Sequence, residues 1–435
     1  MRGARPLSLL TTLLVGAVLL GTRLHYSEVG GRAPLKVTQW DALAYYAYLP
    51  SLFIHHDLAR MGWIEGIDST YQVVGTGGLY QMLPVEDSTL AAQGNRVDKV
   101  LIGMSIVELP FFAIGHLAAW IGGHPQDGFS PPYQWSIGLA PVVYCILGLF
   151  LLRRTLLRWF KDSSVAVVLL LVPLATNAIQ YISVDNAQTH GFLFALYCLQ
   201  LELTHRWHMR PARRTLVTIG CVVVLAALIR PTDVLMFLIP LLWNTHIPEA
   251  ARAKWAQVRA HRKDLPWVIG ACLLLGFPQL LYWKHASGHW FFDIGSKWDF
   301  LSPHWRVLIG WEKGWFIYTP ITVVFMLALL RMRDRPWRWS VAWFMGLTIW
   351  VVIAWHDWRY GGSYSARALM QCLPVLALPF ADLVERALAT RWRWPFLALC
   401  GYLLVVNLWQ VRQYNNGVIK YDGMTREEYL RVYLR

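Results

Sequence analysis

The sequence predicts an all-α polytopic membrane protein with a bundle of about 11 membrane-spanning helices. Of its 435 residues, 56% are hydrophobic and 15% are charged, whereas soluble proteins carry about a quarter charged residues. Apolar runs of roughly 16–20 residues recur along the chain, close to the length that crosses a bilayer. The net charge of +14 resides largely in short loops between these runs, which argues against a nucleic-acid partner and indicates cytoplasmic loops.

The first apolar run, from about Leu7 to Leu20, has the arginines of a signal peptide before it. No small-residue cleavage site follows it before Arg23, so we interpret it as an uncleaved first span. The later runs follow in order, and 234–244 is the shortest of them. We expect spans at 6–23, 134–152, 164–182, 188–204, 215–230, 234–244, 266–283, 315–331, 339–355, 368–385 and 395–411.

Five loops rich in Lys and Arg fall on one side of this scheme. They lie at 153–161, 206–214, 252–263, 331–338 and 386–393. By the positive-inside rule, this side is cytoplasmic. Residues 1–411 then form one transmembrane domain, whereas the large first loop (24–133) and the C-terminal tail (412–435) lie outside the cytoplasm.

The apolar segment 99–122 is also long enough to cross. A crossing there would place every later basic loop outside, given a cytoplasmic N-terminus. Glu108 and Pro110 in the middle of the run are poor choices for a span that faces lipid. We therefore expect this segment to lie along or dip into the outer leaflet, as one of two membrane-lying helices of the first loop.

The aromatic stretch 38–57 carries the first candidate catalytic residue. A helix that starts near Thr38 places Asp41, Tyr45 and Tyr48 on one face. Thr38 and Asp41 also resemble a capping box, in which the acid only complements the helix dipole. Polar residues beside apolar helix ends in the other outward loops favour a functional site, because each would be costly without a partner.

The outward loops supply five cations at helix ends. Each alone resembles a snorkelling anchor, but together they suit the neutralisation of a phosphate group at the membrane surface. Asp185, between two spans, is either a turn residue or a second acid facing the same cavity. The candidate phosphate-binding residues are Lys99, Arg230, Lys313, Arg359 and Arg367.

Metal and nucleotide sites lack support in the sequence. His55, His56 and Asp57 in direct succession cannot face one ion from a regular helix, and Asp57 also suits a solvated helix end. The six cysteines lie in apolar runs without metal-ligand spacing, and no P-loop, GxGxxG or DxD motif is present. We expect no cofactor, with a divalent cation left open. The candidate pocket residues are Tyr45, Tyr48, Asp57, His190, Trp358 and Tyr360.

Several short stretches in a fixed order carry a family resemblance. They are 40–57 (WDALAYYAYLPSLFIHHD), 99–112 (KVLIGMSIVELPFF), 176–192 (TNAIQYISVDNAQTHGF), 229–233 (IRPTD), 313–320 (KGWFIYTP), 358–367 (WRYGGSYSAR) and the tail 414–429 (YNNGVIKYDGMTREEY). Over most of its length the chain resembles bacterial GT-C-fold glycosyltransferases. These polyprenyl-phosphate-sugar-dependent enzymes include the protein O-mannosyltransferases and the lipid A aminoarabinose transferase.

The resemblance implies roles for three residues. Asp41 matches the family's essential acid of the first outer loop, Lys99 matches a lysine that binds the donor phosphate, and Asp185 matches an acid after the third span. The family often carries an acidic pair at the first position, whereas this chain has Trp40 and Ala42 beside Asp41. That departure puts a metal-bridging role in doubt.

The resemblance implies an inverting glycosyltransferase of a bacterial inner membrane, with its active site facing the periplasm. Asp41 would accept a proton from an acceptor hydroxyl on a glycan, lipid or protein, and the cations would stabilise the polyprenyl phosphate that leaves. We also expect membrane lipids as partners, and we expect no nucleic-acid partner. The alternatives are a transporter or flippase of lipid-linked sugars, which would need polar residues near the midplane, and a non-catalytic scaffold.

Overall fold

The computed structural model of the protein is 69% helix and 2% strand, and it describes residues 6–28, 36–75, 78–433 and 435. In this part of the chain, six helices are long and apolar enough to cross a membrane. The all-α class and the membrane character of the protein follow from them. They are α1 (Pro6–Glu28), α5 (Gly103–Gly122), α6 (Pro131–Leu156), α12 (Leu265–Ser287), η5 with α17 (Arg367–Cys372 and Leu373–Leu388) and α18 (Arg393–Asn415).

Each of the eleven expected spans contains helix. The helices other than the six named above are shorter or more polar, so the count of eleven spans stays a prediction. Two expected spans are interrupted: 164–182 by non-helical residues before the π-helix η1, and 315–331 by a break after α14. These elements are α7 (Asp162–Leu174), η1 (Gln180–Val184), α8 (Thr189–Met209), α9 (Arg213–Ile229), η2 (Pro231–Phe237), α10 (Leu238–Leu242), α14 (Trp315–Tyr318), α15 (Ile321–Ala328), η4 (Leu329–Arg331) and α16 (Arg338–Ile353).

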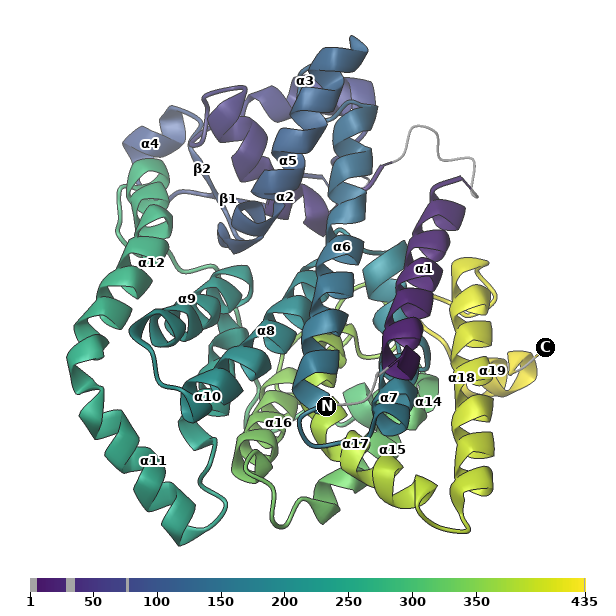
Figure 1. The fold of residues 1–435 in the computed structure, drawn as a ribbon. Coiled ribbons are helices and arrows are strands. Elements are labelled where there is room, and N and C mark those ends of the chain that lie inside the picture. Colours follow the sequence, from purple (N-terminus) through teal and green to yellow (C-terminus); the bar gives the residue numbers. More distant parts are fainter. Residues whose placement is uncertain (1–5, 29–35, 76–77, 434) are drawn as a thin grey trace.

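The first loop folds into a small layer of its own. In Figure 1, α2 to α5 and two short strands gather at one end, above α8 to α10. The strands pair antiparallel, with Met82 opposite Asp98. The remaining elements are α2 (Asp41–Phe53), α3 (Trp63–Tyr71), β1 (Met82–Pro84), α4 (Ser88–Ala92), β2 (Arg96–Asp98), α11 (Pro248–Ala260), η3 (Arg262–Asp264), α13 (Arg306–Ile309) and α19 (Arg426–Val432).

Polar contacts join the basic loops where α1 begins. The backbone N–H of Leu7 donates to Asp162 at the start of α7 (3.0 Å). Next to it, the N–H of Lys161 donates to Glu385 near the end of α17 (2.7 Å). Because each contact joins loops that are distant in sequence, these loops must lie at one end of the bundle.

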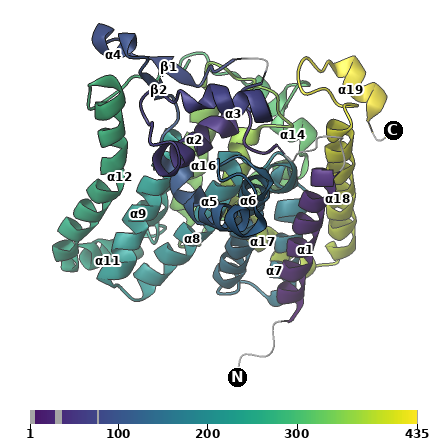
Figure 2. The ribbon, with the colours of Figure 1, turned by 90° about the horizontal axis from the view of Figure 1, so that it is seen from above.

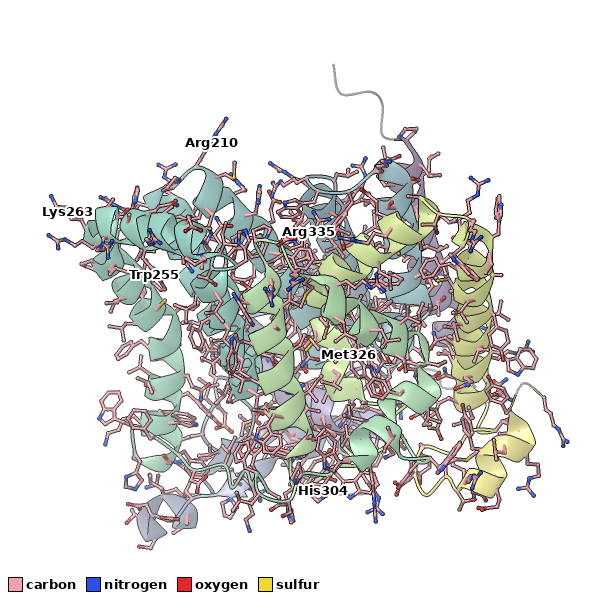
Figure 3. All side chains as sticks on the ribbon, turned by 90° about the horizontal axis from the view of Figure 1, so that it is seen from below. Arg210, Trp255, Lys263, His304, Met326 and Arg335 are labelled. Atoms are coloured by element: carbon pink, nitrogen blue, oxygen red, sulfur yellow. The ribbon has the colours of Figure 1, made fainter. Side chains whose placement is uncertain are left out.

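Figure 3 shows the same grouping, with Arg210, Lys263 and Arg335 at one end and His304 at the other. Figure 2 shows α4, the two strands and α19 at the end opposite to the start of α1. We call the end with the basic loops the basic end, and the end with α2, α4 and α19 the site end. The common location of the basic loops agrees with the charge pattern.

Helix α5 lies beside only the first half of α6. The Tyr144 hydroxyl donates to the Val107 carbonyl (2.9 Å), and Gly115 lies against the backbone of Tyr133. Since α6 continues to Leu156 at the basic end, this antiparallel register makes α5 run away from that end.

The start of α5 is fixed by a close backbone contact. A Cβ on Gly103 would lie 2.3 Å from the backbone nitrogen of Ile229, where α9 ends. Glu108 is buried within the protein rather than turned toward lipid. The expectation that 99–122 does not cross together with the bundle stays a prediction, because α5 is long and apolar enough to do so.

Cysteine labelling in oriented vesicles tests this topology. We expect a membrane-impermeant maleimide to label His124→Cys, just beyond α5, from the same side as Leu301→Cys at the site end. It should label Lys263→Cys only from the other side. Unsubstituted protein, in which no native cysteine is fully exposed, gives the background. Labelling of His124→Cys together with Lys263→Cys would mean that α5 crosses the membrane.

Candidate active site at the end of the bundle

Asp41 is the first residue of α2, and its carboxylate is 29% exposed. The capping box expected from Thr38 does not form: α2 has no side-chain cap, and Thr38 Oγ1 instead accepts from the Gln134 amide (2.8 Å). The capping interpretation is therefore wrong. The Asp41 carboxylate is engaged by two other residues, Tyr80 and Arg367.

Tyr80 connects Asp41 to Lys99. Its hydroxyl donates to Asp41 Oδ1 (2.7 Å), and the Lys99 Nζ lies 4.4 Å from the centre of its ring. Burial raises the pKa of Tyr80, and the hydrogen bond to Asp41 raises it further, so the hydroxyl keeps its proton and remains a donor. Lys99, just after β2, donates its backbone N–H to the Gln81 carbonyl (2.9 Å). The strand pair thereby holds Lys99 near Asp41, with the Tyr80 side chain between the two residues.

Arg367 is the central cation of the site. It opens η5, its side chain is 14% exposed, and its Nη2 lies 3.6 Å from Asp41 Oδ2. It also interacts electrostatically with Asp185 and Tyr45. One guanidinium thus interacts electrostatically with two carboxylates from distant segments.

Asp185 ends the π-helix η1, where its N–H donates to the Gln180 carbonyl (2.9 Å). Burial raises the pKa of Asp185, and the neighbouring Arg367 opposes that rise, whereas Asp41 adds to it. The two acids predicted as catalytic residues therefore lie in one electrostatic cluster, as two negative charges around Arg367.

Arg230 and His190 border this cluster. Arg230, at the end of α9, lies 3.8 Å from Asp233 and donates to the Ala368 carbonyl next to Arg367 (3.4 Å). His190 is buried, with Nδ1 3.3 Å from the Gln371 side-chain oxygen. Electrostatic interactions couple His190 to both arginines.

Lys313 and Arg359 form a second cluster with acids of their own. The buried Lys313 ammonium donates to the carbonyls of Arg359 and Gly361 and lies 3.4 Å from Asp422 in the C-terminal tail. Burial lowers the pKa of Lys313, and Asp422 opposes this effect. Arg359 pairs with Glu312 (3.2 Å). These two cations therefore hold the tail against the loop that leads to Arg367.

Four predicted pocket residues make local structural contacts. Asp57 accepts from the N–H groups of Arg60 (2.9 Å) and Gly62 (3.0 Å), as expected for a solvated helix end. The Tyr48 hydroxyl donates to the Val100 carbonyl (2.7 Å) within the first-loop core.

Trp358 packs against two arginine side chains, and the Tyr360 hydroxyl donates to the Val352 carbonyl (2.7 Å). Two of the predicted pocket aromatics, Tyr45 and Tyr360, interact electrostatically with both Arg367 and Arg230.

Three residues near the clusters are absent from the sequence prediction. Tyr80 and Asp422 belong to loops without periodicity, so no pattern marks them. Asp98 directly precedes Lys99, and that adjacent acid is visible in the sequence. Burial raises the pKa of Asp98 well above its usual value, and the neighbouring Lys99 opposes that rise.

In the described part of the chain, no group of three or more His, Cys, Asp or Glu side chains is placed to hold a metal ion. No family model, no curated protein and no solved structure matches the chain. Its function is therefore inferred from its own residues.

Replacement of Arg367 by Gln should destabilise the protein by about 3 kcal/mol at neutral pH, the lower end for breaking a buried ion pair. The loss should also depend on pH. Arg367 opposes the burial that raises the pKa of Asp185, so its removal raises that pKa further. A carboxyl whose folded-state pKa is raised stabilises the fold below its unfolded pKa, about 3.9, and loses this contribution as the pH rises through the folded value.

Thermal unfolding of detergent-purified protein at several pH values measures this effect. The deficit of Arg367→Gln should be largest at neutral and alkaline pH and should shrink as the solution is acidified. The control is Arg359→Gln, whose side chain is 52% exposed and should contribute about 1 kcal/mol or less. A deficit equal to that of the control at every pH would contradict the shared role of Arg367.

Proposed function

We propose that the protein is an integral membrane glycosyltransferase that moves a sugar from a polyprenyl-phosphate donor to an acceptor hydroxyl. The basic end would face the cytoplasm of a bacterial cell, and the site end would face the periplasm. The proposal depends on the cluster of Asp41, Tyr80, Lys99 and Arg367 more than on any other observation. It also agrees with the resemblance of the sequence to GT-C-fold enzymes.

Asp41 is the candidate general base. Its carboxylate accepts a hydrogen bond from Tyr80 and keeps 29% of its side chain exposed, so it is oriented and still open to an incoming hydroxyl. A base must reach the proton that it removes, and an oriented carboxylate at the surface of the bundle meets that requirement. Asp185, beyond Arg367, would support the charge of the guanidinium.

The candidate ligands for the leaving phosphate flank Asp41 on two sides. Lys99 lies across the ring of Tyr80, and Arg367 lies beside Asp41. Cations in a partly water-excluded site stabilise the negative charge that develops on a departing phosphate. Lys313 and Arg359 are already neutralised by Glu312 and Asp422, so we assign them the support of the loop that precedes Arg367.

A transporter or flippase of lipid-linked sugars is the competing proposal. Alternating access would place polar binding residues near the middle of the bundle, between two halves that move. The charged cluster instead lies where α2, η1 and η5 meet at the site end. A scaffold would not require acids and cations from several separate loops to converge. The enzyme proposal accounts best for this convergence.

Asp41→Asn should lower transfer by about 10²–10⁴-fold, the contribution of a well-placed base. The release of polyprenyl phosphate from a panel of polyprenyl-phosphate-linked hexoses and pentoses, with membrane extract as the source of acceptor, measures the rate. Asp57→Asn, just beyond the end of the same helix, is the matched control, because Asp57 accepts backbone hydrogen bonds from Arg60 and Gly62. Turnover by Asp41→Asn at the rate of the control would contradict the assignment of Asp41 as the general base.

Lys99→Ala should weaken donor binding at least about tenfold, through the loss of a charge-assisted contact to phosphate. Native mass spectrometry of the purified protein with polyprenyl phosphate and its monoglycosylated forms measures binding without knowledge of the acceptor. The exposed Lys297, replaced by Ala, is the control for loss of one positive charge at the site end. If the wild-type protein binds none of these lipids, the donor class is wrong.

A further inference from the structure

A cavity of about 520 Å³ lies at the basic end, far from the candidate active site. It is bounded by η4, by the loop that follows it and by the last turn of α17. Its volume lies within the range of about 300–1,000 Å³ typical of small-ligand sites. Its lining residues are Leu330, Arg331, Arg333, Asp334, Arg335 and Arg386.

Two of these arginines are held in place by one buried acid. Asp382 of α17, whose side chain is 3% exposed, pairs with Arg335 through one oxygen and with Arg386 through the other (2.7 Å). The Arg335 guanidinium also lies 5.4 Å from the centre of the Phe160 ring. Both guanidiniums are thus oriented before any ligand arrives, and each retains further N–H donors.

The cavity carries an excess of positive charge. Four arginines line it against two carboxylates, those of Asp334 and Asp382. Arg331 and Arg333 are exposed at its rim. Planar guanidiniums bind phosphate through paired N–H···O bonds, so the chemistry of the cavity suits a phosphate group.

An apolar stripe on α15 and η4 leads away from this cavity. Val323, Leu327 and Leu330 are 40%, 56% and 81% exposed, and their spacing of four and three residues places them on one helix face. Leu330 also lines the cavity. A phosphate site that continues into an exposed apolar stripe has the shape of a phospholipid, whereas a free phosphate would use only the polar part.

Two exposed tryptophans lie at the same end of the molecule as this cavity. Trp392 and Trp394, at the start of α18, are 62% and 66% exposed, and each has an arginine over its ring. Such residues concentrate at membrane–water interfaces. The cavity therefore lies at the depth where lipid head groups would be found.

We propose that this cavity binds the phosphate of an anionic phospholipid, with an acyl chain along the stripe of Val323, Leu327 and Leu330. Basic pockets between helices on the cytoplasmic side are suited to such head groups. The site is separate from the proposed transfer reaction. It would anchor α15 and α17, and through η5 the position of Arg367, to lipids of one leaflet.

Native mass spectrometry of the purified full chain with phosphatidylglycerol, and separately with phosphatidylcholine, tests this proposal. The double variant Arg331→Gln/Arg333→Gln should bind phosphatidylglycerol at least about tenfold more weakly than the wild type. Both residues are exposed, so the fold should persist, and an unchanged melting temperature would verify this. The control Arg210→Gln/Arg214→Gln removes the same charge from another exposed basic loop and should bind as the wild type does.

The remaining outcomes overturn the proposal. An equal loss in the two double variants would mean non-specific attraction to the basic end. Equal binding of phosphatidylcholine would exclude selection for an anionic head group. Displacement of phosphatidylglycerol by inorganic phosphate at equal concentration would assign the cavity to a free phosphate and leave the stripe without a role.

Discussion

The Arg367 guanidinium lies 3.6 Å from Asp41 and interacts electrostatically with Asp185, and these interactions connect three segments that are far apart in sequence. Asp41 begins a helix of the first loop, Asp185 ends a π-helix, and Arg367 opens the segment that leads into α17. Two acids placed together repel each other, and a buried cation is costly without a partner. The interactions of Arg367 therefore help to hold the three segments together, and they link the layer of α2 to α5 to the bundle.

A second set of charges supports the first. The loop before Arg367 contains Tyr360 and Ser365 at φ of 54° and 58°, a conformation that costs non-glycine residues of order 1 kcal/mol or more each. Lys313 binds two carbonyls of this loop and an acid of the tail. The tail is itself fixed by a capping box at the start of α19. The contacts of the buried Lys313 ammonium thus help to offset the strain in the loop that precedes Arg367.

Hydropathy predicted the helices of the bundle because burial in lipid or protein requires long apolar runs, and charge predicted which loops share an end. Hydropathy could not predict that 164–182 breaks before a π-helix. The carbonyls of Leu174 and Thr176 at this break accept hydrogen bonds from Asn407, which is distant in sequence. At the site, the grouping of Asp41, Lys99, Asp185 and Arg367 agrees with the pattern of polar residues beside apolar helix ends. The pairing of Lys313 with Asp422 could not be predicted from the sequence, because it joins segments more than a hundred residues apart and neither segment has a periodic pattern. Tyr80, which orients Asp41, is one aromatic among many and carries no distinguishing signal.

The two ends of the molecule differ in how their charges are used. At the basic end arginines exceed the acids that face them, whereas at the site end the cations are arranged around carboxylates. An excess of positive charge favours the cytoplasmic side of a membrane, so the proposed orientation places Asp41 at the opposite surface. In that orientation the proposed transfer reaction would draw on a donor that reaches the surface through the lipid, because the charged cluster lies beside apolar helix ends. A phosphate-linked lipid would place its charge at Lys99 and Arg367 while its tail stays in the membrane. The location of the charges, more than the identity of any single residue, therefore favours a lipid-linked donor.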